Sequence, residues 1–307
     1  MDITAVNQKI SSYYTATAGD YFSLLKPRVM SLVIFTALIG LIVAPGEIHP
    51  VIGFTAILCI AIAAGASGCL NMWYEADIDA KMERTAGRPI PSGRIDAQSA
   101  LHFGVALAVS SVLVMGLTVN VVAALLLTVT ILLYVVVYTI WLKRRTAQNI
   151  VIGGASGAFP PMVAWAAVTG DVSLESFVLF AIIFMWTPPH FWALSLFSCK
   201  EYESAGIPML PVVSGEAHTK KQIMLYTMLM VPVTALPWYL GFAGIFYGAT
   251  SVFLGGIFIW LSFALLRDEF SVDENSAKAK KVFFFSIFYL FALFAILGLE
   301  NLLWRLF

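Results

Sequence analysis

The chain has 307 residues, of which 60% are hydrophobic and only 12% charged, and its formal net charge is zero. Soluble domains are about 45–50% apolar and about 25% charged, and a water-soluble globule of this length could not bury so much apolar surface. The composition therefore excludes an ordinary soluble domain and predicts an integral membrane protein. The three cysteines form no C-x-x-C pair, so the sequence gives no sign of a disulfide framework or a zinc site.

Nine apolar runs are candidate transmembrane helices, because a helix needs about 20 residues to cross a bilayer. In chain order they cover residues 29–44, 51–73, 99–119, 121–142, 150–168, 174–197, 223–240, 249–266 and 282–303. The first run is short, so we expect it to recruit residues 21–25, and Asn120 is the main sign that separates the third run from the fourth. We predict an all-α membrane protein with nine transmembrane helices, in one domain over residues 1–307 that begins with a polar tail over residues 1–25.

Basic residues fix the predicted orientation of these spans. With nine spans, every Lys and Arg from Lys9 onward falls on one face of the membrane, except Arg305 near the C-terminus. The positive-inside rule makes this basic face cytoplasmic. We therefore expect a cytoplasmic N-terminus, a C-terminus on the opposite side, and residence in a bacterial cytoplasmic (inner) membrane.

Two of the predicted cytoplasmic loops are long. They cover residues 74–98, after the second span, and residues 198–222, after the sixth. Both spans run in the same direction, so the two loops emerge on one face and can cover one cavity.

The first long loop begins with an acidic pattern at helical spacing. Asn71, Glu75 and Asp79 follow one another at i, i+4 and i+8, which on a continuing helix gives one stripe of oxygen-bearing side chains about 6 Å apart. Magnesium prefers carboxylates together with phosphate oxygens of a substrate, and the planar donors of Arg84 and Arg88 suit phosphate. The pattern predicts a site for magnesium and a diphosphate. The alternative is a solvated cluster of charges beside the membrane.

The second long loop carries a second acidic pair beside a lysine. Lys200 is followed by Glu201 and Glu203. If the two loops face each other, their acids can hold two metal ions on one diphosphate and neutralise its charge as it departs. The alternative is an ordinary solvated loop.

His190 lies inside the sixth apolar run. An ionisable residue within a span is a candidate functional residue. The alternative is a structural histidine, hydrogen-bonded to carbonyls that the prolines Pro188-Pro189 leave free, since we expect these prolines to break the span. Pro160-Pro161 and the small residues at 153–158 favour kinked, closely packed helices around a cavity.

A basic cluster follows the fourth span. Lys143, Arg144 and Arg145 lie at the cytoplasmic mouth of the fourth and fifth spans. They can bind an anion, or they can serve only as a topological anchor.

Four separate motifs, in matching order, resemble those of the intramembrane (UbiA-type) prenyltransferases, and in particular the branch that prenylates haem. The resemblance covers roughly Lys26 to the last span. The motifs are Asn71-x3-Glu75-x3-Asp79-x4-Arg84-Thr85-x2-Arg88-Pro89, Leu142-Lys143-Arg144-Arg145-Thr146-x2-Asn149, Pro188-Pro189-His190-Phe191-Trp192 and Ala205-Gly206-Ile207-Pro208-Met209-Leu210-Pro211.

The resemblance implies a nine-helix bundle around a central cavity open to lipid. It implies farnesyl diphosphate and haem b as substrates and haem O as product, on the route to haem A for terminal oxidases. The partners that it implies are haem-handling or oxidase-assembly proteins, with no nucleic acid. It implies Mg²⁺ held by Asn71, Glu75, Asp79 and Glu201, although the family often has Asp where this chain has Glu201. The basic residues implied for diphosphate or haem propionates are Arg84, Arg88, Lys143, Arg144 and Lys200, and His190 would contact haem or orient a water.

Two other functions compete with this interpretation. The first is a prenyltransferase of the same type that acts on an aromatic or quinone precursor. The second is a secondary transporter, since broken helices and charged groups in a cavity also occur there. Transporter sites lie near the middle of the bilayer, whereas the charges here gather at the cytoplasmic ends of the spans.

Overall fold

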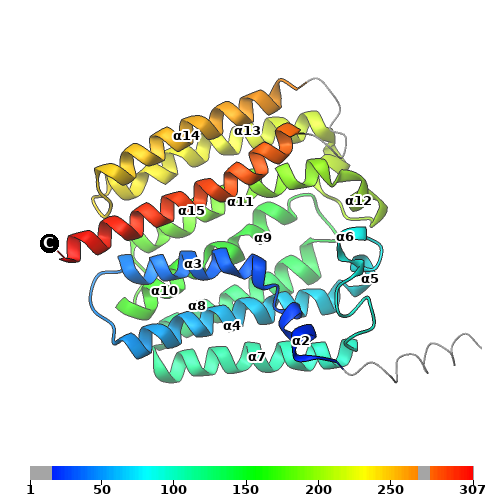
Figure 1. The fold of residues 1–307 in the computed structure, drawn as a ribbon, viewed down its shortest axis with the longest axis horizontal. Coiled ribbons are helices and arrows are strands. Elements are labelled where there is room, and N and C mark those ends of the chain that lie inside the picture. The colour runs from blue at the N-terminus through cyan, green and yellow to red at the C-terminus, as the bar shows by residue number, and fades with distance from the viewer. Residues whose placement is uncertain (1–15, 269–276, 307) are drawn as a thin grey trace, which may run out of the picture.

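The computed structural model describes residues 16–268 and 277–306, and within these ranges the chain is helical and forms no strand. The long helices lie side by side in one bundle, and the short helices α5, α6 and α12 gather at the end opposite the C-terminus (Figure 1). Residues 1–15 of the predicted tail, with Lys9, lie outside the described residues.

The long helices follow the predicted apolar runs closely, usually within a few residues at each end. Their bounds are α3 (Pro27–Val43), α4 (Pro50–Tyr74), α7 (Ala97–Thr118), α8 (Val121–Leu132) continued by the π-helix η1 (Leu133–Leu142), α9 (Asn149–Ala158), α10 (Pro160–Thr169), α11 (Leu174–Phe197), α13 (Leu210–Tyr239), α14 (Ile245–Leu266) and α15 (Ala277–Leu306). The short helices are α2 (Ala18–Leu24), α5 (Ala76–Asp79), α6 (Glu83–Ala86) and α12 (Cys199–Ser204).

The described part of the chain contains seven helical segments that are long and apolar enough to cross a membrane. An eighth is formed if α2 and α3, which meet at an angle of 58°, count as one bent span. The predicted run at 223–240 lies in the second half of α13, whose first half is polar. The membrane character of the protein is confirmed, while the total of nine spans stays a prediction.

Asn120 separates α7 from α8, as the sequence predicts. Its side-chain oxygen accepts a hydrogen bond from the backbone N–H of Ala123 (2.8 Å) and so caps the start of α8. Its amide nitrogen donates to the carbonyl of Ala166 in α10 (2.8 Å). One polar side chain therefore starts α8 and ties it to α10.

The two proline pairs behave differently. Pro160 begins α10 and marks the boundary with α9, as expected. The prediction that Pro188-Pro189 breaks the sixth span is wrong, because α11 continues through both prolines to Phe197. Each proline removes one backbone hydrogen bond, but α11 packs against α9, α13 and α15, and this packing holds the helix together.

Small residues allow the close helix packing that the sequence predicts. A Cβ on Gly40 of α3 would overlap the backbone of Pro161 in α10, and one on Gly153 of α9 would overlap the ring of Tyr138 in η1. A Cβ on Gly154 would lie 2.8 Å from Cγ2 of Thr187 in α11. These glycines let α9 approach both η1 and α11, which places the π-helix beside the site described below.

A buried acid that the sequence analysis did not single out stabilises the far end of the bundle. Glu300 of α15 is 6% exposed, and its carboxylate accepts hydrogen bonds from the backbone N–H groups of Gly244 (2.7 Å), Phe246 (2.9 Å) and Tyr247 (3.2 Å). It therefore caps the start of α14 from a neighbouring helix.

We expect Gly40→Ala to lower the free energy of unfolding by about 1–3 kcal/mol, because the added methyl group forces α3 away from α10. Reversible unfolding of the purified protein in mixed micelles with increasing SDS measures this change. Gly256→Ala is the matched control, since a Cβ there meets nothing within 4 Å. Equal stabilities of the two variants would contradict the close approach of α3 and α10.

Candidate active site

The predicted stripe of Asn71, Glu75 and Asp79 forms at the junction of α4 and α5. Glu75 leaves the helical conformation (φ −99°, ψ 13°), yet its N–H still donates to Asn71 O (3.0 Å) and its carbonyl accepts from Asp79 N (2.8 Å). The four-residue repeat therefore continues through the junction. The three residues are 2%, 2% and 3% exposed, so the stripe is buried although it lies at the end of the bundle.

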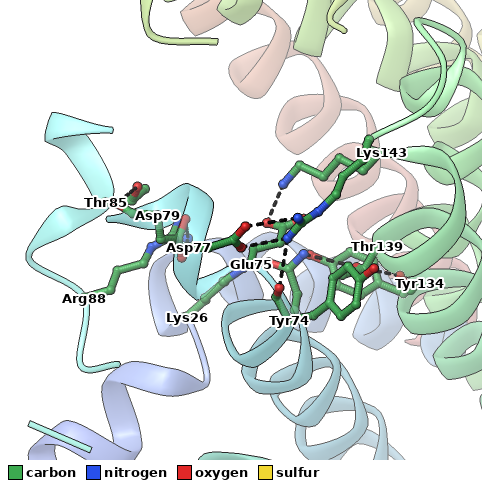
Figure 2. A network of polar contacts seen from close by, with 12 residues as sticks. Lys26, Tyr74, Glu75, Asp77, Asp79, Thr85, Arg88, Tyr134, Thr139 and Lys143 are labelled. Atoms are coloured by element: carbon green, nitrogen blue, oxygen red, sulfur yellow. Dashed lines mark hydrogen bonds and ion pairs between the residues drawn. The ribbon is translucent and has the colours of Figure 1, made fainter. Parts of the chain in front are cut away.

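Each member of the stripe contacts one basic side chain of the chain, and Figure 2 labels Lys143 beside Glu75 and Arg88 beside Asp79. The contacts are Lys26 Nζ with Asn71 Oδ1 (2.6 Å), Lys143 Nζ with Glu75 Oε2 (2.5 Å), and Arg88 Nη1 with both oxygens of Asp79 (2.8 and 2.7 Å). Buried carboxylates need partners of this kind, because an unpaired charge away from water is very costly. The prediction of a merely solvated cluster is therefore wrong for these three residues.

The π-helix η1 presents two groups to the stripe. Lys143 follows directly after η1, and its N–H donates to Tyr138 O (2.9 Å), five residues back. Thr139 Oγ1 accepts from Asn71 Nδ2 (3.1 Å) and donates to Tyr134 O (2.8 Å). Burial by itself would lower the pKa of Lys143, but the attraction of Glu75 and the hydrogen bond to it raise the pKa above its usual value. Lys143 is therefore a firmly charged group at this site.

One oxygen of the stripe has no partner among the described residues. Glu75 Oε1 is buried and accepts no hydrogen bond, since Lys143 contacts only the other oxygen. Within the described ranges no three His, Cys, Asp or Glu side chains form a complete metal site. Magnesium does not require one, because it is usually bound by one or two carboxylates, waters and substrate phosphates. Glu75, Asp79 and the amide oxygen of Asn71 fit such a partial site.

A second ion pair lies outside the stripe. Arg144 contacts Asp77 through two nitrogens (2.7 and 3.1 Å), donates to Tyr74 O (3.1 Å) and lies over the Tyr74 ring. The hydrogen bond from Arg144 lowers the pKa of the Asp77 carboxyl. The Arg144 side chain is 35% exposed, against 17% for Lys143, so Arg144 faces the outer rim of the site.

The two long loops meet, as the sequence predicts. Arg84 of α6 lies with its Nε 4.0 Å from Glu201 Oε2 of α12. That Glu201 oxygen is buried and accepts no hydrogen bond from the described residues. Lys200 lies on the same short helix and is exposed. The ends of the second and sixth predicted spans are therefore on the same side of the bundle (Figure 1).

His190 is held between two rings and one hydroxyl group. It stacks on Trp186 (ring centroids 4.3 Å apart) and Phe283 (4.6 Å), and its Nδ1 lies 2.7 Å from Ser286 Oγ of α15. Ser286 donates its own hydrogen to Phe283 O (2.6 Å), so its oxygen is left to accept from His190. We therefore assign the hydrogen of the neutral ring to Nδ1, which leaves the lone pair of Nε2 free to accept a hydrogen bond or bind a metal.

Lys26 and Thr139 are the site residues that the sequence analysis missed. The sequence presents Lys26 only as a basic residue before the first span, because the bend between α2 and α3 that brings it to Asn71 has no signal beyond Pro27. Thr139 had no distinguishing pattern, because it lies in an apolar run and reaches the stripe only through the π-helical turn.

Comparison with known proteins gives consistent matches over nearly the whole chain. Residues 33–299 match the model of the UbiA prenyltransferase family. The chain is 63% identical over 287 residues to the "Protoheme IX farnesyltransferase" of Parvibaculum lavamentivorans, covering 94% of this chain and 90% of that protein.

Solved structures share the fold at low sequence identity. One, described as digeranylgeranylglyceryl phosphate synthase, has a TM-score of 0.76 at 18% identity and covers 92% of this chain and 98% of its own. A UbiA homologue from Archaeoglobus fulgidus bound to DMAPP and Mg²⁺ has a TM-score of 0.64 at 15% identity and covers 90% and 99%.

We expect Lys143→Met to lower the free energy of unfolding by about 3–5 kcal/mol, because it leaves the Glu75 carboxylate buried and unpaired. The double variant Lys143→Met/Glu75→Gln should recover most of this loss, as unfolding in mixed micelles would measure. Lys278→Met is the control: its side chain is 47% exposed and its contact with Asp268 is open to solvent, so the loss should stay below about 1 kcal/mol. Additive losses in the double variant would show that the two side chains do not interact.

Proposed function

The chain belongs to the UbiA prenyltransferase family, and from this premise we propose that it transfers the farnesyl group of farnesyl diphosphate to a vinyl group of haem b. With the addition of water the products are haem O and diphosphate. The observation that carries the proposal is the 63% identity, over 94% of the chain, to a protein named protoheme IX farnesyltransferase. The buried stripe and its cations supply the chemistry that such a transfer needs.

We assign the diphosphate to the buried cations of the site. Arg88 and Lys143 have side chains that are 23% and 17% exposed and already hold carboxylate oxygens in hydrogen-bond geometry. The same donors suit phosphate oxygens. Arg84, Arg144 and Lys200 are more exposed and are suited to the propionates of haem.

Asn71, Glu75 and Asp79 would hold Mg²⁺, and the unpartnered oxygen of Glu75 supports this role. When bound, the ion would neutralise negative charge that develops on the departing diphosphate. The Archaeoglobus fulgidus homologue was solved with DMAPP and Mg²⁺. Glu201 has a buried oxygen without a hydrogen bond and is the proposed acid of the second loop.

The reaction proceeds by ionisation of an allylic ester. The carbon–oxygen bond of farnesyl diphosphate breaks and its electron pair leaves with the diphosphate, whose charge Arg88 and Lys143 balance. The vinyl group of haem b then donates its electron pair to the farnesyl cation and forms the new carbon–carbon bond. The resulting cation beside the macrocycle adds water and loses a proton, which gives the hydroxyl group.

His190 is suited to one of two roles: it can assist the addition of water in the last step, or it can contact the haem acceptor. Ser286 and the rings of Trp186 and Phe283 fix its orientation, and the free lone pair of Nε2 can accept a proton from the attacking water or contact the haem. His190 is thus the proposed residue that acts on the haem side of the reaction.

The protein is an integral membrane protein, and we place it in a bacterial inner membrane with the site on the cytoplasmic side. This orientation follows from the basic loops. The proposed product is a membrane-bound haem, so haem-handling or oxidase-assembly proteins are the proposed partners. An aromatic or quinone acceptor is the weaker candidate, because the relative of 63% identity is named for haem.

We expect the purified chain to convert haem b and farnesyl diphosphate into haem O only when Mg²⁺ is present, as chromatography of extracted haems would measure. Asp79→Asn should reduce the rate at least about 100-fold, because the variant loses a ligand and the partner of Arg88. Asp77→Asn, which removes an acid outside the stripe, should retain most activity. Full activity of Asp79→Asn would contradict the assigned site.

We expect Ser286→Ala to reduce haem O formation about tenfold, the effect of one lost hydrogen bond of about 1.4 kcal/mol, since the His190 ring loses its fixed tautomer. His190→Ala should reduce it further, and neither change should alter the affinity for farnesyl diphosphate. Ser262→Ala, which loses a similar hydrogen bond to Thr227 elsewhere in the bundle, is the control. Normal rates for His190→Ala would exclude this histidine from the reaction.

A further inference from the structure

Lys26 occupies its place in the site at the expense of an unfavourable backbone conformation. It has φ 51° and ψ 54°, and it is the only non-glycine residue with positive φ among those the structure describes. Left-handed backbone is unfavourable for a residue with a side chain, and such outliers gather at functional sites. Pro27 follows directly and begins α3, so the bend between α2 and α3 aims the side chain at Asn71.

The neighbouring helix leaves room for this side chain. A Cβ on Gly68 of α4 would lie 3.4 Å from Lys26 Cδ, in van der Waals contact with it. The stem of Lys26 therefore runs along α4 where that helix has no side chain, and the ammonium reaches the Asn71 oxygen at 2.6 Å. Backbone and packing together place the Lys26 amine on the first member of the stripe.

The three contacts of the stripe share one electrostatic arrangement. Lys26, Lys143 and Arg88 come from three separate segments, and each covers one member of the stripe. A divalent cation that arrives alone finds a basic side chain already in contact with each member of the stripe, and the charges of Arg88 and Lys143 repel it. A diphosphate that arrives alone meets the two carboxylates. When both arrive, the ion can take the stripe while the basic groups turn to phosphate oxygens.

We infer that Lys26 is a further binding residue of the site. Its amine occupies the Asn71 oxygen when no metal is bound, and it moves to the diphosphate when metal and diphosphate bind together. The inference rests on the proposed function, because it assumes that the stripe receives both ligands. It assigns Lys26 two opposite effects: it opposes the metal ion alone and supports the diphosphate.

The sign of these two effects separates this role from a structural one. Lys26→Met removes the charge and keeps much of the apolar stem. Binding of Mn²⁺ alone should become roughly tenfold tighter, because its competitor at Asn71 is gone, while binding of an unreactive farnesyl thiodiphosphate with Mn²⁺ should become roughly tenfold weaker. A lysine that only supports the fold would weaken both.

The experiment uses the purified full chain in detergent, with free Mn²⁺ counted by its EPR signal and binding of the thiodiphosphate measured by calorimetry. Lys26→Gln repeats the test with a polar neutral side chain, Lys26→Arg should restore binding of the diphosphate, and Lys278→Met is the matched control for loss of a paired lysine. The wild-type chain should itself bind Mn²⁺ at least roughly tenfold more tightly with the thiodiphosphate than without it, after correction for complexes in solution.

Three results would overturn the inference: weaker or unchanged Mn²⁺ binding in the folded Lys26 variants, unchanged binding of the thiodiphosphate, or independent binding of the two ligands by the wild-type chain. The last measurement decides the matter even if the Lys26 variants do not fold. Haem O formation by the wild type is assayed in parallel. If the wild type forms haem O but the expected changes in Mn²⁺ and thiodiphosphate binding are absent, only the role of Lys26 is rejected. If it forms no haem O and binds neither ligand, the proposed function is rejected as well.

Discussion

The structure depends on one constraint: oxygen-bearing side chains are buried at the end of a membrane helix and need positive partners. Asn71, Glu75 and Asp79 are almost fully buried, and a carboxylate in such a place is stable only when it is paired. Three segments far apart in the sequence each supply one cation. The short helices, the bend before α3 and the π-helix are all means of bringing these charges together.

Close packing of the bundle makes that convergence possible. Tyr138 of η1 rests on Gly153, so α9 fixes the π-helix, and η1 in turn presents Thr139 and Lys143 to the end of α4. The contact of Arg84 with Glu201 brings the second long loop over the first. The apolar bundle thus acts as a rigid frame, and the reactive groups lie on its ends and connecting segments, where small changes of chain direction decide which charges meet.

Local patterns predicted most of the fold and the acidic half of the site. Apolar runs of membrane length gave the helices, and the i, i+4 spacing gave the stripe, because both depend on neighbours within a turn or two of helix. Only Arg88, nine residues from Asp79, belongs to the same local pattern. The pairing of the other two partners could not be predicted, since Lys26 lies 45 residues from Asn71 and Lys143 lies 68 from Glu75. The continuity of α11 through Pro188-Pro189 likewise depends on packing with other helices, which the sequence does not display.

We propose that the end of α4 receives the metal and the diphosphate. A structure of the purified chain with Mn²⁺ and an unreactive farnesyl thiodiphosphate tests it most directly, since the anomalous signal of manganese locates the ion. We expect a peak within bonding distance of Glu75 and Asp79, with the diphosphate beside Arg88 and Lys143. A manganese peak and a diphosphate elsewhere in the bundle, with the stripe still paired to its cations, would contradict it.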